Sequence, residues 1–525
     1  MNGPVAPKVG ARMSPTPPGP IGVPYGQVRQ RLTAPRVEVD EATVIRLRGV
    51  CPEILLDDAS TAEAGRDWWP LAIRWADQGA VPALPHLVAR PSDASQVAAV
   101  LGVCNEAGIP VTAAAGRSGV CGGSVPAYGG VALDMTGLEG VTALDSTSML
   151  ADVLPGTFGP DLETALRSQG TTLGHWPQSM DLSTVGGWLA CRGAGQYSTR
   201  YGKIEDMVVG LEVALADGRI IRTGGTGPRA ATGPDLTQMF VGSEGTLGII
   251  TSARLRLHRV PPAEARRAYA VSGFAQGLDV CRHILQRGGT PAVLRLYDQM
   301  ESARNFGLDD TCAIVILDEA DPAVLAATMQ IVDTECAAAG AQRLADSVVE
   351  RWVATRNDVS ALAPLYGMGI VVDTAEISAR WSALPGIYEA ALQELNDLEG
   401  TLAASAHESH AYIDGACLYF TFAGQMPGGS GTPSAGDAEG RAAQDVWAES
   451  YYTSAWDRVM EAVSQRGGAI SHHHGIGINR ARFMAEALGG AFDVLCALKT
   501  ALDPRGILNP GKLGMPTHFG QVGWP

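Results

Sequence analysis

The sequence predicts an α+β protein built from two large domains, and three observations support this prediction. The chain has 525 residues, 46% of them hydrophobic, so it is long enough to bury a core in each of two domains. Between about 86 and 262, short apolar strands are punctuated by glycine-rich turns, with a few helices. Between about 265 and 460, strands alternate with longer helices, which is typical of a second α+β domain.

The N-terminal part begins with a proline-rich stretch. The first 24 residues contain seven prolines, and we expect them to form a flexible tail. A strand is predicted over 86–90. Ser92 or Asp93 is then expected to cap an amphipathic helix over 96–108, after which a strand resumes at 109–113.

Further along, the pattern predicts a hairpin over 207–223 that turns at Asp217-Gly218. The next predicted elements are a half-buried strand over 250–258, a strand over 312–319, a helix over 322–340 and a surface loop over 424–431.

Charge and cysteine usage exclude several classes of protein. The net charge of −16 argues against a nucleic-acid-binding protein, which needs clustered Lys and Arg to neutralise phosphates. The nine cysteines are scattered and form no C-x-x-C pair, which favours reduced thiols over a disulfide framework or a zinc ribbon. No apolar run approaches the length of a membrane span and no secretory leader is recognised, so we expect a cytoplasmic protein.

Three glycine-rich segments of the first domain share one chemistry. They lie at 113–124, at 181–187 with its continuation to 195, and at 242–248. Small residues allow backbone N–H groups to converge on an anion, and Ser118 adds a hydroxyl donor. None of the three is a G-x-G-x-x-G motif in a βαβ unit or a P-loop. Singly, each segment is no more than a glycine-rich turn, whereas the order and spacing of the three together are more specific.

In order and spacing, these loops resemble the FAD-binding domain of the vanillyl-alcohol oxidase (PCMH) type, and the end of the chain at 502–512 continues the likeness. The resemblance implies a two-subdomain FAD-binding domain plus an α+β cap domain that holds the substrate. The residues it implies for FAD are Ala115, Gly116, Arg117, Ser118, Gly119, Val120 and Cys121 of the first loop, Asp181, Ser183, Thr184, Val185, Gly186, Gly187, Arg192, Gly193 and Gly195 of the second, and Ser243, Glu244, Gly245, Thr246, Leu247, Gly248 and Ile250 of the third.

The resemblance also suggests how the chain is divided. We expect a flexible tail and lead-in over 1–49, the FAD-binding domain over 50–262, the cap domain over 263–465, and a segment over 466–525 that completes the active site and returns to the FAD domain. The first loop offers no histidine for a covalent flavin link, and we expect Cys121 to be a small packing residue. FAD should therefore be bound non-covalently.

Within this superfamily the chain is most similar to the alkyldihydroxyacetonephosphate synthases, on the segments 183–207, 295–298, 414–422 and 471–477. These enzymes replace the acyl group of acyl-dihydroxyacetone phosphate by a long-chain alcohol, without net redox change. The resemblance assigns catalytic roles to Tyr419, His473, His474 and Arg356, and substrate-binding roles to Arg295 and His410. For Arg295, a structural ion pair is an equal alternative.

A flavin-dependent 2-hydroxy acid dehydrogenase of the same architecture is the nearest rival. Some of these enzymes hold a divalent metal with two histidines and a glutamate. Here Tyr419 stands in place of the second histidine and His473 in place of the glutamate, so we expect no metal, with zinc on His410 and His473 as the alternative. His472 is expected to point away from its neighbour in an extended run. A merely structural, hydrogen-bonded loop is the alternative for all three histidines.

Tyr419 belongs to a predicted strand, on which Tyr419 and Thr421 share one face while Leu418 and Phe420 point to the other. We expect neighbouring imidazoles or a guanidinium to lower the pKa of the phenol.

Three functions remain open: the ether-lipid-forming transferase, an oxidase or dehydrogenase of a 2-hydroxy acid or alcohol, and a flavin-carrying protein without turnover. The partner is expected to be a small-molecule or lipid substrate and not a nucleic acid. The apolar stretch at 480–500 favours core packing, with peripheral membrane contact as the alternative, and a homodimer is left open.

Overall fold

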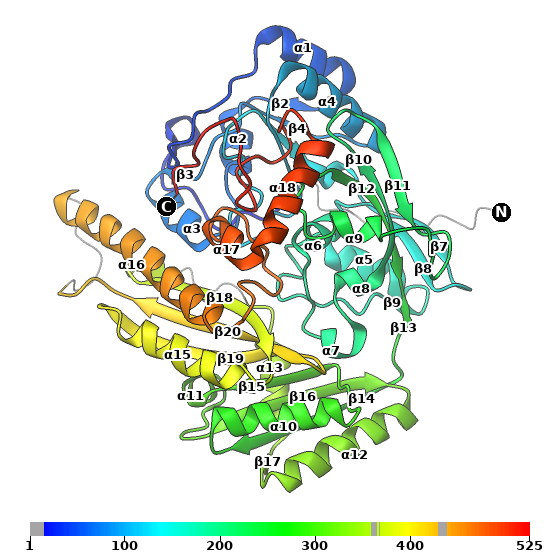
Figure 1. The fold of residues 1–525 in the computed structure, drawn as a ribbon, viewed down its shortest axis with the longest axis vertical. Coiled ribbons are helices and arrows are strands. Elements are labelled where there is room, and N and C mark those ends of the chain that lie inside the picture. The colour runs from blue at the N-terminus through cyan, green and yellow to red at the C-terminus, as the bar shows by residue number, and fades with distance from the viewer. Residues whose placement is uncertain (1–14, 359–364, 367, 429–437, 525) are drawn as a thin grey trace.

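The computed structural model describes residues 15–358, 365–366, 368–428 and 438–524. Two bodies are evident in Figure 1: residues up to about 260 form the upper one, and a broad sheet with its helices forms the lower one. The C-terminal segment runs back from the lower body to the upper one. The α+β class predicted from the sequence is therefore confirmed.

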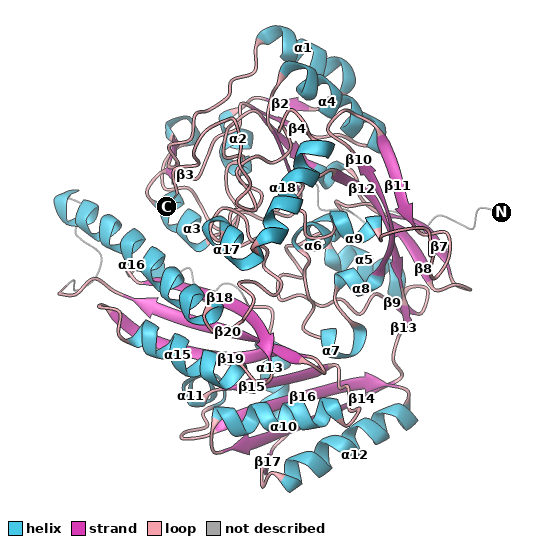
Figure 2. Ribbon diagram, viewed as in Figure 1, coloured by secondary structure: helices cyan, strands magenta, loops and turns pink. Residues whose placement is uncertain are grey.

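The first domain contains two sheets, which Figure 2 shows among short helices. A four-stranded sheet has the order β2 (Ile54–Leu55), β4 (Leu87–Ala89), β6 (Val131–Asp134), β5 (Val111–Ala114). A five-stranded antiparallel sheet has the order β11 (Ile220–Gly224), β10 (Val208–Ala214), β12 (Ile249–Arg256), β8 (Leu150–Val153), β7 (Val141–Asp145). Two-stranded pairs join β1 (Arg29–Gln30) to β3 (Ala80–Val81) and β9 (Thr171–Thr172) to β13 (His258–Arg259).

Short helices cover these sheets, and each sheet has its own buried core. They are α1 (Glu41–Val50), α2 (Asp58–Ala64), α3 (Pro70–Asp77), α4 (Ala94–Ala107), α5 (Gly159–Arg167), α6 (Val185–Cys191), α7 (Ser198–Tyr201), α8 (Ile204–Met207) and α9 (Leu236–Phe240), with 3-10 turns η1 (Tyr25–Gln27) and η2 (Met135–Gly137).

The local predictions for this domain are confirmed. Asp93, not Ser92, caps α4, because its carboxylate accepts the Gln96 N–H at 2.8 Å. The helix ends at Gly108, whose φ of 69° is the left-handed conformation that glycine tolerates best. The predicted hairpin is β10 and β11, and it turns where the Gly218 N–H donates to the Leu215 carbonyl.

The N-terminal lead-in differs from the prediction of a flexible tail. Residues 1–14 lie outside the described residues, but the following segment is held by the fold: the Gly22 N–H donates to the Ala76 carbonyl, and Leu32 and Leu47 are buried. Helix α1 packs on α4, so the boundary expected at residue 50 falls at the end of an element of the first domain. A proline-rich composition did not reveal these long-range contacts.

The cap domain is one seven-stranded antiparallel sheet. Its order is β17 (Gln342–Leu344), β14 (Ala263–Val271), β16 (Cys312–Ala320), β15 (Val293–Tyr297), β19 (Thr401–Ala411), β20 (Gly415–Gly424), β18 (Val371–Arg380). Its helices are α10 (Phe274–Gln286), α11 (Gln299–Phe306), α12 (Pro322–Ala338), α13 (Ser347–Thr355), α15 (Leu384–Asn396) and α16 (Ala438–Ser464). The loop expected over 424–431 lies partly outside the described residues.

Alternation along the cap strands separates two faces of the sheet. Leu418 and Phe420 of β20 are fully buried in a core shared with α10, α15 and α16. Tyr419 and Thr421 point to the opposite face, where a large cavity lies. The predicted division of this strand is therefore confirmed.

The C-terminal segment contains η4 (Ala481–Phe483), α17 (Met484–Leu488) and α18 (Gly490–Leu502), and then returns to the first domain. There Leu508 forms a parallel bridge to Val111 of β5. The apolar stretch at 480–500 is only half accommodated by core packing: Phe492 and Leu498 pack partly against the cores, whereas Val494 is 61% exposed. Among the described helices, none combines the length and apolarity needed to cross a membrane.

Candidate active site

A cavity of about 970 Å³ lies where the three glycine-rich loops meet the open face of the cap sheet. Most of the residues predicted to contact FAD line it, namely Ala115, Gly116, Arg117, Ser118, Gly119, Val120, Cys121, Ser183, Thr184, Gly186, Gly187, Gly193, Ser243, Glu244, Gly245, Gly248 and Ile250. Such a volume is in the range of cofactor and ligand sites.

The loops pack so closely that several positions require glycine. A Cβ on Gly116 would stand 2.2 Å from the Leu182 carbonyl oxygen of the second loop, and one on Gly186 would stand 2.6 Å from the Pro155 Cβ. Gly245 has a φ of +72°. The loops thus present backbone and small side chains to the cavity, which is the donor set that a dinucleotide pyrophosphate requires.

Six of the predicted cofactor residues do not line the cavity, for local reasons. Val185 and Leu247 are buried in the core of the five-stranded sheet. The Thr246 hydroxyl donates to the Ser243 carbonyl, and Arg192 extends to Glu205 at the surface. Gly195 packs against the Trp176 backbone, and Asp181 is exposed. They lie beside lining residues in the sequence, but each is buried in the core, bonded within its loop, packed against the backbone or directed to the surface.

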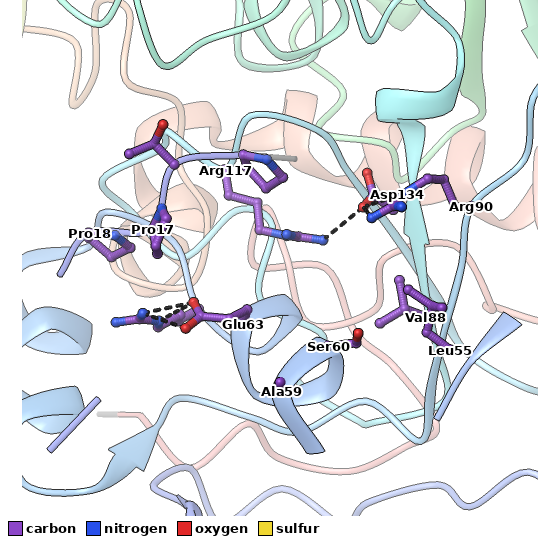
Figure 3. A pocket seen from close by; sticks show the side chains of 13 residues that line it. Pro17, Pro18, Leu55, Ala59, Ser60, Glu63, Val88, Arg90, Arg117 and Asp134 are labelled. Atoms are coloured by element: carbon purple, nitrogen blue, oxygen red, sulfur yellow. Dashed lines mark hydrogen bonds and ion pairs between the residues drawn. The ribbon is translucent and has the colours of Figure 1, made fainter. Parts of the chain in front are cut away.

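Arg117 shapes the first loop of the cavity through its backbone conformation. Its φ of 51° turns the first loop, and its guanidinium points behind the loop toward Asp134, 3.8 Å away (Figure 3). There it lines a second cavity of about 240 Å³ with Arg90 and Glu63. Cys121 is buried, and burial raises the pKa of its thiol. A protonated thiol is a poor nucleophile, which supports the prediction that FAD is held without a covalent bond.

The third loop is joined to the C-terminal segment by Glu244. Its carboxylate is buried and accepts the backbone N–H groups of Ile476, at 2.5 Å, and Gly477, at 2.9 Å. These residues follow the histidine triplet, His472 to His474, after the intervening Gly475. One carboxylate thus fixes the triplet relative to the loop that is predicted to hold the cofactor.

Glu376 of β18 holds the triplet from the other side. It accepts the His474 N–H at 3.0 Å and the Ser471 hydroxyl at 2.9 Å, and it also accepts the His472 N–H. The Arg480 guanidinium donates to it at 2.8 Å, and both side chains are fully buried. Although burial opposes ionisation, Arg480 and the neighbouring histidines hold the pKa of Glu376 well below its usual range.

The triplet is therefore a tight turn and not an extended run, which corrects the prediction for His472. Its Nδ1 lies 2.9 Å from the His473 Nδ1, and its Nε2 lies 3.0 Å from the Tyr412 hydroxyl. The N–H groups of His472 and His474 both donate to the Glu376 carboxylate, and His473 and His474 line the cavity.

Tyr419 lies at the centre of the cavity face. Its hydroxyl accepts from Thr374 at 3.1 Å and stands 3.4 Å from the His474 Nε2. A cross-strand row runs through it: Tyr297 of β15 pairs with His407 of β19, His407 with Tyr419, and Tyr419 with Glu376. Tyr419 is thus flanked by imidazoles on two sides.

The prediction that these neighbours lower the pKa of Tyr419 was wrong. Burial raises that pKa, and the Glu376 charge raises it further. The imidazoles add no positive charge, because burial lowers the pKa of His473 to about 3 and that of His474 to about 4. Tyr419 is therefore a protonated phenol beside neutral histidines at neutral pH.

The two predicted arginines both line the cavity. Arg295 donates to the Tyr297 hydroxyl at 2.9 Å and to the Ser409 carbonyl at 3.2 Å, both neutral partners, so the ion-pair alternative finds no support. Arg356 donates to the Gln196 side chain at 2.6 Å, and burial lowers its pKa. Two largely desolvated positive charges thus face the cavity.

His410 also lines the cavity, because a β-bulge between Glu408 and His410 shifts the strand register. Its Nε2 is buried and has no hydrogen-bond partner in the described part of the chain. The ligand atoms of His410, Cys417, His472 and His473 all lie within 4.8 Å of one another. This is a set that zinc accepts, and it is larger than the pair of histidines considered from the sequence.

Sequence reasoning missed several residues of the cavity wall, namely Tyr297, Glu301, Arg304 and His407, and it also missed Cys417 of the candidate metal cluster. His407 could have been found, because the strand alternation that selected Tyr419 applies equally to the segment 405–411. Glu301 could not, because it comes from a helix whose placement depends on the whole sheet.

Comparisons with known proteins agree with this geometry. The FAD binding domain family matches residues 85–224, and the C-terminal domain of FAD linked oxidases matches residues 260–513. An uncharacterized FAD-linked oxidoreductase of Escherichia coli, YgcU, is 30% identical over 446 residues, covering 82% of this chain and 89% of the relative. The chain belongs to the FAD-linked oxidase family.

Other members of this family carry more specific names. Alkyldihydroxyacetonephosphate synthase of Dictyostelium discoideum is 28% identical, and the match covers 84% of this chain and 74% of the relative. Glycolate oxidase subunit GlcD of Bacillus subtilis is also 28% identical, covering 82% and 89%.

Solved structures share the fold. One of alkyldihydroxyacetonephosphate synthase has a TM-score of 0.75 at 23% identity, covering 96% of this chain and 90% of its own. One of p-cresol methylhydroxylase has a TM-score of 0.70 at 16% identity, covering 92% and 99%. This member of the FAD-linked oxidase family is therefore an FAD-dependent enzyme with the predicted two-domain architecture of the PCMH type.

Proposed function

We propose that this FAD-dependent enzyme exchanges the acyl group of acyl-dihydroxyacetone phosphate for a long-chain alcohol, as the name of its synthase relatives suggests. The observation that carries the proposal is the placement of Tyr419. Its hydroxyl stands 3.4 Å from His474, in a cavity that Arg295 and Arg356 also line. The reaction needs these parts: cations for a phosphate, and a proton-transfer group beside the carbon that reacts.

The two arginines suit the substrate charge. A phosphate monoester carries close to two negative charges at neutral pH, and it needs local cations in a protein whose net charge is −16. Arg295 and Arg356 offer donors whose partners are uncharged oxygens, so their charge is not already neutralised. We assign the phosphate to this pair.

Tyr419 and His474 suit the proton transfers. The neutral His474 can accept the proton removed from the α-carbon, because Glu376 lies 3.9 Å from its Nδ1 and stabilises the resulting imidazolium. The protonated Tyr419 can donate a hydrogen bond to the oxygen on which negative charge develops. When bound, FAD supplies an electron-accepting ring beside these groups.

The direct test is a product assay. The FAD-loaded protein is incubated with palmitoyl-dihydroxyacetone phosphate and labelled hexadecanol. Equal amounts of released fatty acid and labelled alkyl product are expected, with no consumption of oxygen or of an electron acceptor. Acceptor reduction without alkyl product would refute the transferase.

The Tyr419→Phe variant tests the central residue. We expect it to fold, to retain FAD, and to turn over at least about 100-fold more slowly, the usual scale for loss of a proton-transfer group. Tyr388→Phe is a matched control, because Tyr388 stacks on Phe274 among the helices of the cap. Equal rates for the two variants would reduce Tyr419 to a packing residue.

A second candidate is an FAD-dependent dehydrogenase of a 2-hydroxy acid. The cluster of His410, Cys417, His472 and His473 favours it, since some 2-hydroxy acid dehydrogenases of this architecture hold a divalent metal.

Under the transferase proposal, dialysis against a chelator should leave activity unchanged, and the purified protein should carry well under one zinc or manganese per chain by elemental analysis. A stoichiometric metal whose removal abolishes activity, and whose return restores it, would favour the dehydrogenase.

A further inference from the structure

A second carboxylate–imidazole pair lies on the side of Tyr419 opposite His474. Glu301 of α11 accepts the Nδ1–H of His407 at 2.8 Å. The two rings of His407 and Tyr419 are stacked, with centroids 5.0 Å apart and planes 24° apart. Both members of the pair line the large cavity.

The surroundings of Glu301 keep its carboxylate ionised. It is 1% exposed, yet it accepts the hydroxyls of Ser405, at 3.1 Å, and Thr421, at 3.2 Å, and Arg304 lies 3.3 Å away. Burial raises its pKa, but His407 and Arg304 outweigh burial and bring the pKa to about 2. A buried carboxylate with four polar partners holds an imidazole in one orientation.

The position of His407 is fixed on its other sides as well. Its ring is sandwiched between Tyr297, at 5.2 Å, and Tyr419, at 5.0 Å, each inclined by 24°. Since Nδ1 is bound to Glu301, the proton of the neutral ring resides there and Nε2 carries a lone pair. Within the described residues, Nε2 has no hydrogen-bond partner. A fixed lone pair at a cavity wall is the arrangement of a general base.

We propose that His407, positioned by Glu301, is a second catalytic base of this cavity, which accepts the hydroxyl proton of the incoming alcohol through Nε2. This inference rests on the proposed transferase. The alcohol O–H bond breaks as its oxygen bonds to the carbon that carried the acyloxy group; the acyloxy oxygen leaves that carbon with the bonding electron pair as a fatty-acid carboxylate. The imidazolium then loses its proton to water, so nothing is oxidised or reduced.

The division of labour follows from the geometry. His474 serves the α-carbon from one side of Tyr419 and works with Glu376, whereas His407 lies on the other side and works with Glu301. The reaction must both remove and return a proton at carbon and remove one from the alcohol. Two separately charged pairs allow the two substrates to be deprotonated independently.

The test separates the two halves of the reaction. With palmitoyl-dihydroxyacetone phosphate alone in D2O, deuterium incorporation at the α-carbon measures the first half, which needs no alcohol. With labelled hexadecanol added, alkyl product measures the second. For His407→Gln, we expect deuterium incorporation within about threefold of the parent and alkyl product at least about 100-fold slower.

Glu301→Gln keeps the imidazole and removes only its charged partner. The groups that face His407 are Glu301 and Arg304 of α11, Arg295 and Tyr297 of β15, His410 of β19 and Tyr419 of β20. Loss of the negative charge destabilises the imidazolium, so the pKa of His407 falls. The acid limb of the kcat/KM profile for the alcohol should therefore move to lower pH, and product formation should fall about 10-fold to 100-fold.

The matched control is His283→Gln on α10, whose side chain is 53% exposed. FAD content and the melting temperature of each variant verify folding. The inference is overturned if His407→Gln slows both halves equally or neither, or if Glu301→Gln leaves the pH profile unmoved. A parent enzyme that releases no fatty acid at all overturns the proposed function instead, and this inference with it.

Discussion

The charges nearest to Tyr419 determine how protons can move in this cavity. Arg480 pairs with Glu376 and helps to keep the carboxylate beside the triplet ionised. Among the described residues, the bases that face the phenol are neutral imidazoles, with His474 at 3.4 Å. The protein thus keeps Tyr419 as a donor and uses histidines as acceptors, the reverse of a mechanism that relies on a lowered phenol pKa.

Arg356 provides the sharpest test of charge at the residue scale. It is held by Gln196 at 2.6 Å and by the rings of Tyr197 and Trp352, and none of these neutralises it. Arg356→Met keeps most of the side-chain volume and removes the charge. We expect full FAD content and a loss of turnover of about 100-fold or more, the usual result of removing an electrostatic donor.

The control for this variant is Arg351→Met on the same helix, whose guanidinium reaches the Asn305 carbonyl at an exposed position. Its turnover should match that of the parent enzyme in the same assay. Normal activity of Arg356→Met would assign Arg356 to the packing of α13.

At the scale of elements, period-two alternation was sufficient to predict which face of β20 carries Tyr419. The same argument cannot place His410, because the bulge between Glu408 and His410 changes the register, and the sequence gives no sign of a bulge. The histidine triplet was also beyond local reasoning. Its turn depends on Glu376, which lies about a hundred residues earlier on another strand.

The glycine loops show the opposite case, in which local composition was decisive. Backbone contact between loops needs glycine wherever they meet, and the three segments were recognised from that feature alone. The residues that do not line the cavity, such as Val185 and Thr246, have side chains that pack or hydrogen-bond within the loops. Sequence proximity cannot separate these two roles.

Gly116→Ala tests this loop packing. The new Cβ would lie 2.2 Å from the Leu182 carbonyl oxygen and push the first two loops apart. Overpacking of this kind costs about 1–3 kcal/mol, and about 1.4 kcal/mol is a factor of ten in affinity. We therefore expect FAD to bind about tenfold or more weakly, as measured by titration of the apoprotein with FAD followed by flavin fluorescence.

Gly102→Ala is the control for this substitution, because a Cβ on Gly102 of α4 meets no atom within 4 Å. It should retain normal FAD affinity and gain about 0.5–1 kcal/mol in unfolding free energy from the better helix propensity of alanine. Unchanged FAD affinity in Gly116→Ala would mean that the first two loops do not shape the cofactor site together.

At the scale of the whole molecule, the C-terminal segment joins the two domains through two buried carboxylates. Glu244 of the first domain binds the backbone at Ile476 and Gly477, and Glu376 of the cap binds the triplet and Arg480. The active site thus exists only when both domains are folded and docked. Composition predicted two domains, but it gave no indication that one short segment couples them.

Glu376→Gln tests this coupling. It leaves the Arg480 guanidinium, which is fully buried, without a countercharge. Removing one partner of a buried pair costs about 3–5 kcal/mol, because the remaining charge stays desolvated. We expect the urea midpoint of unfolding to fall accordingly, and flavin release to follow the same transition as tryptophan fluorescence, since the segment supports both domains. The matched control is Asp457→Asn, which breaks the pair at 2.8 Å between Arg482 of the same segment and Asp457 of α16, with side chains 21% and 51% exposed. That surface pair should contribute no more than about 1 kcal/mol. If Glu376→Gln unfolds at the same urea concentration as Asp457→Asn, the buried pair does not couple the domains, and the triplet must be held in place by its contacts to Glu244 alone.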